Sequence, residues 1–208
     1  MPAYLFVDRL PDAAGTRHHG CMPLDANAAL IVIDMQQGFA DPAWGRRNNP
    51  DCEANVAALL DAWVGSDRPV VLVRHDSVGE ASPLNPDNPG NALLDFVAAA
   101  PHQLFVTKQV NSAFFGEPDL SEWLSALDIE QIVVCGIQTN MCVETTARMG
   151  GNLGFEVFVP IDATHTFDLE GPNGARLSAD ELAAATAVNL HGGEFATVLS
   201  TAELLERV

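Results

Sequence analysis

The stretch AALIVIDM at Ala28–Met35 begins with six consecutive apolar residues, and the acidic residue Asp34 follows them. A continuous apolar run of this length is typical of a parallel strand that is buried on both faces of a sheet. Two further runs have the same character, PVVLVRH at Pro69–His75 and EQIVVCGI at Glu130–Ile137. The three runs predict strands of a mostly parallel sheet.

Segments with helical spacing of apolar residues alternate with the apolar runs along the chain. This alternation predicts an α/β fold, a three-layer sandwich in which a six-stranded, mostly parallel sheet has helices on both faces. We expect the strands at Ala28–Asp34, Pro69–His75, Gln103–Lys108, Glu130–Ile137, Phe155–Asp162 and Glu194–Leu199. We expect the helices at Glu53–Asp67, Asn91–Ala99, Leu120–Leu127, Asn140–Asn152 and Ser178–Leu190.

The first 27 residues contain several prolines and glycines and no long periodic segment. They predict an irregular N-terminal arm at 1–27, with a short edge strand at Tyr4–Val7, ahead of one α/β domain at 28–208. The adjacent His18 and His19 lie in this arm, where a histidine pair is more often solvated than bound to a metal.

Acidic residues dominate the charge of the chain, with 28 Asp and Glu against 10 Lys and Arg and a net charge of −18. This balance argues against nucleic acid and against an anionic membrane surface as partners. The sequence has no apolar run long enough to span a bilayer and no signal-peptide pattern at its start. The 4 cysteines show no C-x-x-C spacing. These features predict a cytoplasmic protein with reduced thiols.

Three reactive side chains follow three of the predicted strands. Asp34 ends the first strand, Lys108 ends the third, and Cys142 lies in the first turn of the helix after the fourth. In open parallel sheets, ligands bind beyond the carboxyl ends of the strands. We therefore expect an acid, an amine and a thiol to converge at one edge of the sheet.

This set of residues could perform nucleophilic catalysis. A helix start, capped by Thr139 or Asn140, and the nearby Lys108 ammonium would favour a thiolate at Cys142. Asp34 could take the thiol proton and later deliver it to a leaving amine. Backbone N–H groups of this turn could bind an oxyanion.

Each of the three residues also has an ordinary structural interpretation. Cys142 could be a small buried apolar residue, Asp34 a solvated strand end and Lys108 a surface lysine. If the first and third strands are not neighbours, Lys108 must reach across two strand spacings, about 9–10 Å. The catalytic interpretation therefore depends on all three side chains meeting at one edge.

Three motifs resemble the isochorismatase-like cysteine hydrolase superfamily. They are DMQQGF at 34–39, a lysine followed by NSAFFG at 108–116, and GIQTNMCVETTARMGGNLGF at 136–155. The resemblance implies a six-stranded parallel sheet and a catalytic triad of Asp34, Lys108 and Cys142. It also implies a cis peptide bond between Ile137 and Gln138, with the N–H groups of Gln138 and Cys142 as the oxyanion hole, and assembly as a dimer or tetramer.

The superfamily contains several activities. The cysteine favours cleavage of a C–N bond through a thioester, and RHDS with SPLNPDNPGN at 74–77 and 82–91 looks like the amidase-type members similar to streptothricin hydrolase. The Asp-x-His metal pattern of nicotinamidases is missing, so we expect no metal and no cofactor. The expected function is a cysteine amidohydrolase acting on a small carboxamide, lactam or ureido compound. The alternatives are a vinyl-ether hydrolase of the isochorismatase type, which uses Asp34, and a non-catalytic binding protein on the same fold.

Residues in the motif loops are candidates for the substrate pocket. We expect Phe39 and Phe114 to form pocket walls, with Trp44 and His75 beside them, whereas the alternative for the aromatic residues is ordinary core packing. A histidine at a strand end is more often a hydrogen-bonded structural residue than a catalyst. Arg74 could pair with Asp76 or Glu80, or bind a substrate carboxylate.

Overall fold

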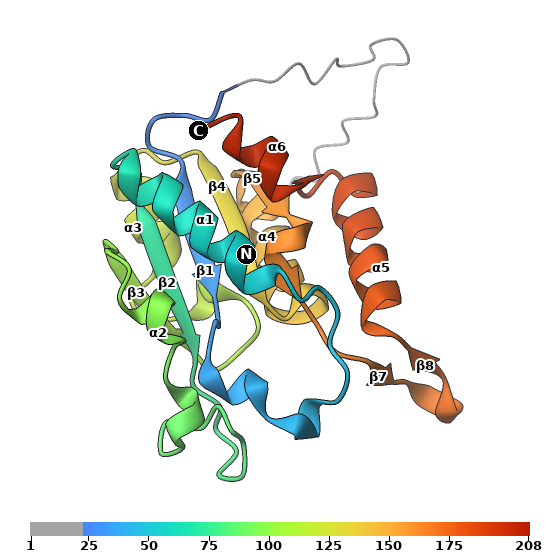
Figure 1. Ribbon diagram of the computed structural model, residues 1–208. Helices are drawn as coiled ribbons and strands as arrows, with labels where there is room; N and C mark the ends of the chain where they lie inside the picture. The colour runs from blue at the N-terminus through green and yellow to red at the C-terminus, as the bar shows by residue number, and fades with distance from the viewer. Residues whose placement is uncertain (1–22) are drawn as a thin grey trace, which may run out of the picture.

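The structure is a computed structural model that describes residues 23–208, and the strands of its main sheet from β1 to β5 alternate with α-helices along the chain (Figure 1). The strands are β1 (Ala29–Ile33), β2 (Val70–His75), β3 (Leu104–Lys108), β4 (Gln131–Ile137), β5 (Glu156–Pro160), β6 (Thr164–His165), β7 (Leu169–Glu170), β8 (Arg176–Leu177) and β9 (Thr197–Leu199). The helices are α1 (Cys52–Gly65), α2 (Asp95–Ala98), α3 (Leu120–Ala126), α4 (Glu144–Leu153), α5 (Ala179–Gly192) and α6 (Thr201–Leu205).

The main sheet is parallel, with the strand order β3-β2-β1-β4-β5-β9, and the short β6 pairs with the end of β4. β7 and β8 form a separate antiparallel hairpin, which projects beside α5 (Figure 1). The parallel sheet confirms the predicted α/β fold. Because β2 lies between β1 and β3, the residue that ends β3 must cross β2 to reach the end of β1.

Two apolar cores lie on the two faces of the sheet, and alternate residues of β1 belong to each. Leu30 and Val32 pack with residues of α1, α2 and α6, whereas Ile31 and Ile33 pack with residues of α3, α4 and α5. This alternation follows from the two-residue period of a strand. A sheet covered by helices on both faces is the predicted three-layer sandwich.

Several boundaries differ from the predictions. The helix expected at Asn140–Asn152 is a π-helical turn at Thr139–Val143 followed by α4, and the helix expected at Asn91–Ala99 shortens to α2. The strand expected at Phe155–Asp162 ends at Pro160, which has no N–H to continue a ladder. Only Thr197–Leu199 of the last expected strand is extended in the sheet.

The sequence interpretation missed the C-terminal helix α6. Its start is marked by a capping box, in which the Ser200 side chain accepts from the N–H of Glu203 and the Glu203 carboxylate accepts from the N–H of Ser200. This pattern is a readable helix-start signal. The same device, with Ser178 and Glu181, begins α5.

The predictions for the start of the chain lie mostly outside the described residues. These are the edge strand at Tyr4–Val7, the pair His18 and His19, and most of the arm at 1–27. Within residues 23–208, none of the helices combines the length and the apolar character that a membrane crossing needs.

Candidate active site

Asp34 lies at the carboxyl end of β1, where the chain leaves the sheet. Its φ of 50° is left-handed, a conformation that Asp adopts more readily than most residues. Its backbone N–H donates to the carbonyl of Val73 on β2, which ties the turn to the sheet. The side chain is fully buried, and its Oδ1 has no hydrogen-bond partner among the described residues. One carboxylate oxygen is therefore free to accept a proton.

Lys108 ends β3 and extends its side chain beneath the end of β2 toward β1. It pairs in register with His75, its neighbour across the parallel ladder. Its Nζ lies 2.6 Å from Asp34 Oδ2, and the Lys108 residue is only 2% exposed. The long side chain of Lys108 therefore spans β2, as the strand order requires.

Cys142 lies in the π-helical turn that joins β4 to α4, and its residue is 8% exposed. Its Sγ is 3.3 Å from Lys108 Nζ and 3.9 Å from Asn111 Oδ1. The acid, the amine and the thiol therefore meet at one edge of the sheet, and Lys108 contacts both of the others. The ordinary interpretation of Lys108 as a surface residue does not hold.

A fourth side chain touches the same ammonium. His75 Nδ1 is 3.2 Å from Lys108 Nζ. Asp34, His75 and Cys142 bring their donor atoms within 4.8 Å of one another, a grouping that could hold a metal ion. The Lys108 ammonium contacts all three residues, at 2.6, 3.2 and 3.3 Å. In this structure the positive charge next to the three donor atoms is therefore that of Lys108.

The electrostatics differ from the sequence expectation for Cys142. Burial, and then the Asp34 charge, raise the pKa of the Cys142 thiol to about 12, although the Lys108 ammonium lowers it. The expectation of a lowered thiol pKa is therefore wrong, because burial outweighs the single ammonium. Burial lowers the pKa of Lys108, but the Asp34 and Cys142 charges and hydrogen bonds outweigh it and raise that pKa overall. The resting site holds a neutral thiol beside an ion pair.

The turn before Cys142 has a distinctive backbone. The peptide bond between Ile137 and Gln138 is cis, at the position that the resemblance indicates. The carbonyl of Gln138 accepts from the N–H groups of Met141 and Val143, which closes the turn. Gln138 is the residue at the start of this turn and makes no side-chain cap bond.

The expected caps, Thr139 and Asn140, instead tie the turn to the segment around β6. Thr139 Oγ1 lies 2.8 Å from Thr164 Oγ1. The hydroxyl of Thr166 donates to Asn140 Oδ1. The capping prediction is therefore wrong, because these side chains pair across the loop rather than with their own helix. These links hold the turn in place.

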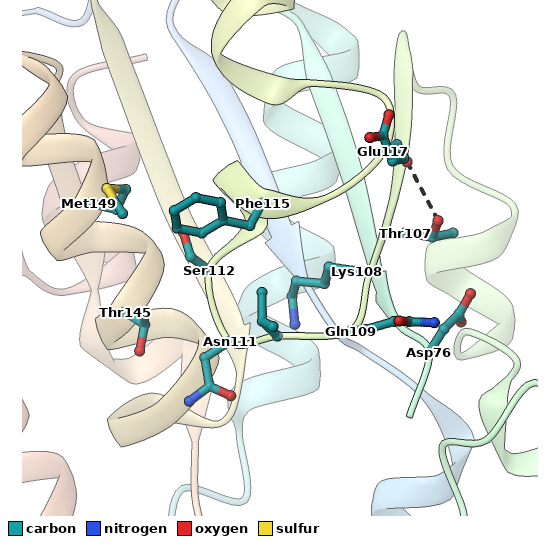
Figure 2. A pocket seen from close by; sticks show the side chains of 11 residues that line it. Asp76, Thr107, Lys108, Gln109, Asn111, Ser112, Phe115, Glu117, Thr145 and Met149 are labelled. Atoms are coloured by element: carbon teal, nitrogen blue, oxygen red, sulfur yellow. Dashed lines mark hydrogen bonds between the residues drawn. The ribbon is translucent and has the colours of Figure 1, made fainter. Parts of the chain in front are cut away.

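A cavity of about 820 Å³ opens above Lys108. In Figure 2, Phe115 lies beside Thr145 and Met149 of α4, whereas Asp76 lies on the other side of the cavity. Asn111 lines this cavity and also contacts Cys142 Sγ. The thiol therefore lies next to the cavity, behind the Asn111 side chain.

The predicted pocket aromatics occupy different places. Phe39 and Trp44 contact each other with tilted rings, 5.1 Å between their centroids, and Phe39 lines a second, smaller cavity of about 190 Å³. Phe114, expected as a pocket wall, is 8% exposed and stacks on Phe155 in the core. Its neighbour Phe115, which is 68% exposed, lines the large cavity instead. The 3-10 turn at Ala113–Phe115 points the two rings in different directions.

The smaller cavity also contains a buried histidine that sequence reasoning did not single out as a pocket residue. His165 is 1% exposed, and its Nδ1 has no hydrogen-bond partner among the described residues. Burial and the Arg47 charge lower its pKa to about 4, so the ring is neutral at neutral pH. Ile137, the residue before the cis peptide bond, lines the same cavity.

Sequence reasoning also missed the buried amides that position the strand ends. Gln36 and Asn91 are 1% and 5% exposed, and both bind the backbone of His75. The only available signal was their type and their place in the loops. Arg74, by contrast, makes one of the predicted pairs, a two-pronged contact with Asp76 at 2.7 and 3.0 Å.

The fold and the site define an α/β protein with the acid, amine and thiol arrangement of a cysteine hydrolase. The family described as "Isochorismatase domain" matches residues 28–202. The chain therefore belongs to the isochorismatase family, and among its relatives are cysteine hydrolases.

Several known proteins are similar to this chain. An isochorismatase family protein of Bacillus subtilis, YrdC, is 36% identical over 88% of this chain and 96% of its own length. A crystal structure of an isochorismatase family hydrolase from Chromobacterium violaceum is 40% identical, with a TM-score of 0.82 over 89% of this chain and 96% of that chain. A cysteine hydrolase from Pseudomonas syringae is 27% identical, with a TM-score of 0.79 over 89% and 94%.

Two of the similar proteins are named for the compound on which they act. Nicotinamidase 3 of Arabidopsis thaliana is 32% identical over 76% of this chain and 84% of its own length. Streptothricin hydrolase of Streptomyces noursei is 30% identical over 70% of this chain and 57% of its own length.

Proposed function

We propose that the protein is a cysteine amidohydrolase that cleaves a C–N bond of a small carboxamide, lactam or ureido compound through a thioester on Cys142. The observation that carries the proposal is the contact of the Lys108 ammonium with both the Cys142 thiol and the Asp34 carboxylate, whose second oxygen is free. A base, a cation and a nucleophile within hydrogen-bond reach are the parts that acyl transfer requires.

The neutral thiol decides the order of the first step. Because the pKa of Cys142 is about 12, little thiolate exists at neutral pH before substrate binds. Asp34 takes the thiol proton as Sγ attacks the carbonyl carbon, and Lys108 stabilises the sulfur as it becomes negative. The backbone N–H groups of Gln138 and Cys142 are the proposed donors to the carbonyl oxygen as it gains charge.

The second half of the reaction returns the site to its starting state. The C–N bond breaks, and the proton held by Asp34 leaves with the amine or ammonia. Asp34 then takes a proton from water as the water oxygen attacks the thioester carbonyl. The C–S bond breaks, the acid leaves, and the proton returns to Cys142 Sγ. Lys108 remains an ammonium throughout, which agrees with its raised pKa.

The cavities indicate where the two parts of a substrate could lie. The large cavity, with Asn111 and Phe115 in its wall, is open and could hold a sizeable group. The smaller cavity, lined by Phe39 and Ile137, could hold a compact group on the other side of the scissile bond.

The test is release of ammonia or amine from a panel of carboxamides, lactams and ureido compounds, with isochorismate included. Wild type should turn over at least one C–N substrate, while Cys142→Ala and Asp34→Asn should each remove nearly all turnover. Pyruvate release from isochorismate that is insensitive to thiol alkylation would instead support vinyl-ether hydrolysis by Asp34. Wild-type amide turnover by Cys142→Ala would overturn the thioester mechanism.

We also propose that the protein forms a dimer or tetramer. Several large apolar side chains are exposed, among them Phe115 at 68% beside the large cavity and Val188 at 69% on α5. Burial of such side chains must offset the repulsion between chains of charge −18. Elution from a sizing column at several salt concentrations tests this, and a monomer throughout would contradict it.

A further inference from the structure

The Lys108 ammonium has three N–H groups and contacts three acceptors. Two of them, Asp34 Oδ2 and Cys142 Sγ, belong to the proposed reaction. The third is His75 Nδ1, at 3.2 Å, to which the proposed reaction gives no role. We propose that His75 is a positioning residue: its neutral ring holds the third N–H of Lys108, so that the other two point at Asp34 and Cys142, and protonation of the ring in mild acid releases this hold.

The geometry requires one form of the His75 ring. An ammonium can only donate, so Nδ1 must carry a lone pair and the ring proton must lie on Nε2. A protonated ring would place a second cation 3.2 Å from Nζ and would remove the acceptor. The contact is therefore compatible with neutral His75 alone.

Two buried side-chain amides hydrogen-bond to the backbone of His75 and fix its position. The amide of Gln36 binds it twice, with Nε2 donating to the His75 carbonyl at 3.0 Å and Oε1 accepting from the His75 N–H at 2.9 Å. Asn91 Nδ2 donates to the same carbonyl at 3.1 Å. Both amides are buried. These bonds set the position from which the ring reaches Lys108.

The charges around the ring agree with a neutral state. Burial, and then Lys108, lower the pKa of His75 below its ordinary value of 6.5, while Asp34 and Asp76 act in the opposite direction. Asp76 is itself paired with Arg74, which limits its pull on the ring. Below that lowered pKa, the ring would carry a positive charge beside the Lys108 ammonium and could no longer accept its N–H. Turnover should therefore fall in acid.

Two substitutions of similar size distinguish the effect of the hydrogen-bond acceptor of His75 from the effect of its side-chain volume. Asparagine in His75→Asn offers an oxygen close to the position of Nδ1 and cannot be protonated in this pH range. Leucine in His75→Leu has nearly the same shape and no acceptor. A purely structural role would make the two variants alike, whereas the positioning role makes them differ.

The substrate-free measurement is alkylation of Cys142 by iodoacetamide in the full chain, followed by mass spectrometry of the peptide that carries Cys142. At about pH 8, His75→Asn should match wild type, and His75→Leu should react about tenfold more slowly, because a displaced Lys108 no longer lowers the thiol pKa. Equal rates for His75→Leu and wild type would overturn the positioning role.

The second measurement is the pH dependence of turnover on a panel substrate, and it rests on the proposed function. Wild type should lose activity in acid, at a pH below the ordinary His value of 6.5 because the pKa of His75 is lowered, and His75→Asn should lack this part of the loss. An unchanged acid limb in His75→Asn would overturn the switch. If no C–N compound is cleaved, the proposed function fails, and the alkylation pattern still decides the role of His75.

Discussion

Cys142 and Cys135 are two buried thiols with different surroundings. Cys135 lies inside β4, is fully buried, and faces the apolar core on the α1 side of the sheet. Burial alone raises its pKa. Cys142 lies just beyond the same strand, where burial also raises the thiol pKa but Lys108 opposes it and Asp34 offers a free oxygen.

The difference teaches that the reactivity of a thiol in this fold depends on its neighbours rather than on its burial. The apolar side chains within β4 pack in the two cores, whereas residues beyond its carboxyl end meet groups from the ends of other strands. A cysteine beyond the carboxyl end of β4 can react as a nucleophile because β1 supplies Asp34 and β3 supplies Lys108 beside it.

The largest expected effect breaks this comparison directly. Cys142→Ala should lower turnover by at least about 1,000-fold, because it removes the atom that forms the thioester. Cys135→Ala is the matched control: it should keep turnover within about threefold and cost about 1 kcal/mol of stability. Steady-state kinetics and urea unfolding of both variants measure these effects. Equal losses of turnover would show that the two thiols are not functionally distinct.

The second prediction concerns the ion pair between Lys108 and Asp34, which is present beside Cys142 and absent beside Cys135. Lys108→Met should lower the free energy of unfolding by about 3–5 kcal/mol, because it leaves the Asp34 carboxylate buried without a partner. It should also abolish turnover. Urea unfolding near neutral pH measures the loss of stability.

A double variant sharpens this second prediction. Lys108→Met combined with Asp34→Asn removes both charges, so it should be less destabilised than the sum of the two single variants. Additive losses of stability would mean that the pair is not coupled, which would contradict the 2.6 Å contact.

The third prediction extends the comparison to another group dominated by burial, His165. Its folded pKa of about 4 lies below the ordinary 6.5, so the unfolded chain takes up the proton first as the pH falls. Stability should therefore decrease from pH 6.5 to pH 4, by about 3 kcal/mol more in wild type than in His165→Gln. Urea unfolding across this range measures the difference, and parallel curves for the two proteins would refute it.

The smallest expected effect concerns Asn111, which is exposed and contacts Cys142 Sγ only at 3.9 Å. A contact this long is weak. Asn111→Ala should change kcat/KM by less than about tenfold and leave stability within about 0.5 kcal/mol of wild type. A loss as large as that of Cys142→Ala would mean that Asn111 belongs to the reacting groups.

The sequence could predict the fold and the three central residues, because each of those residues ends an apolar run or starts the next helix. It left open whether the first and third strands are neighbours, and therefore whether Lys108 must cross another strand to reach Asp34, as it does across β2. The strand order follows from the packing of the whole chain, which no local pattern records.

Finer details depended on local geometry that the sequence does not fix. Phe114 and Phe115 are adjacent and chemically alike, and only the turn at Ala113–Phe115 decides which ring enters the core. The direction of the thiol pKa needed the actual depth of burial at Cys142. Thr139 was expected as a cap, but its hydroxyl meets Thr164, a partner that is distant in sequence.

The most direct test of the central claim is to look for the covalent intermediate. The most rapidly cleaved compound of the C–N panel is mixed with wild-type protein, quenched with acid within the first turnover, and digested for mass spectrometry. We predict that the acyl group appears on the peptide that carries Cys142 and is absent from the peptide that carries Cys135. Turnover with no acyl group on Cys142 under conditions where the first amine is already released, or an acyl group on another residue, would contradict the account.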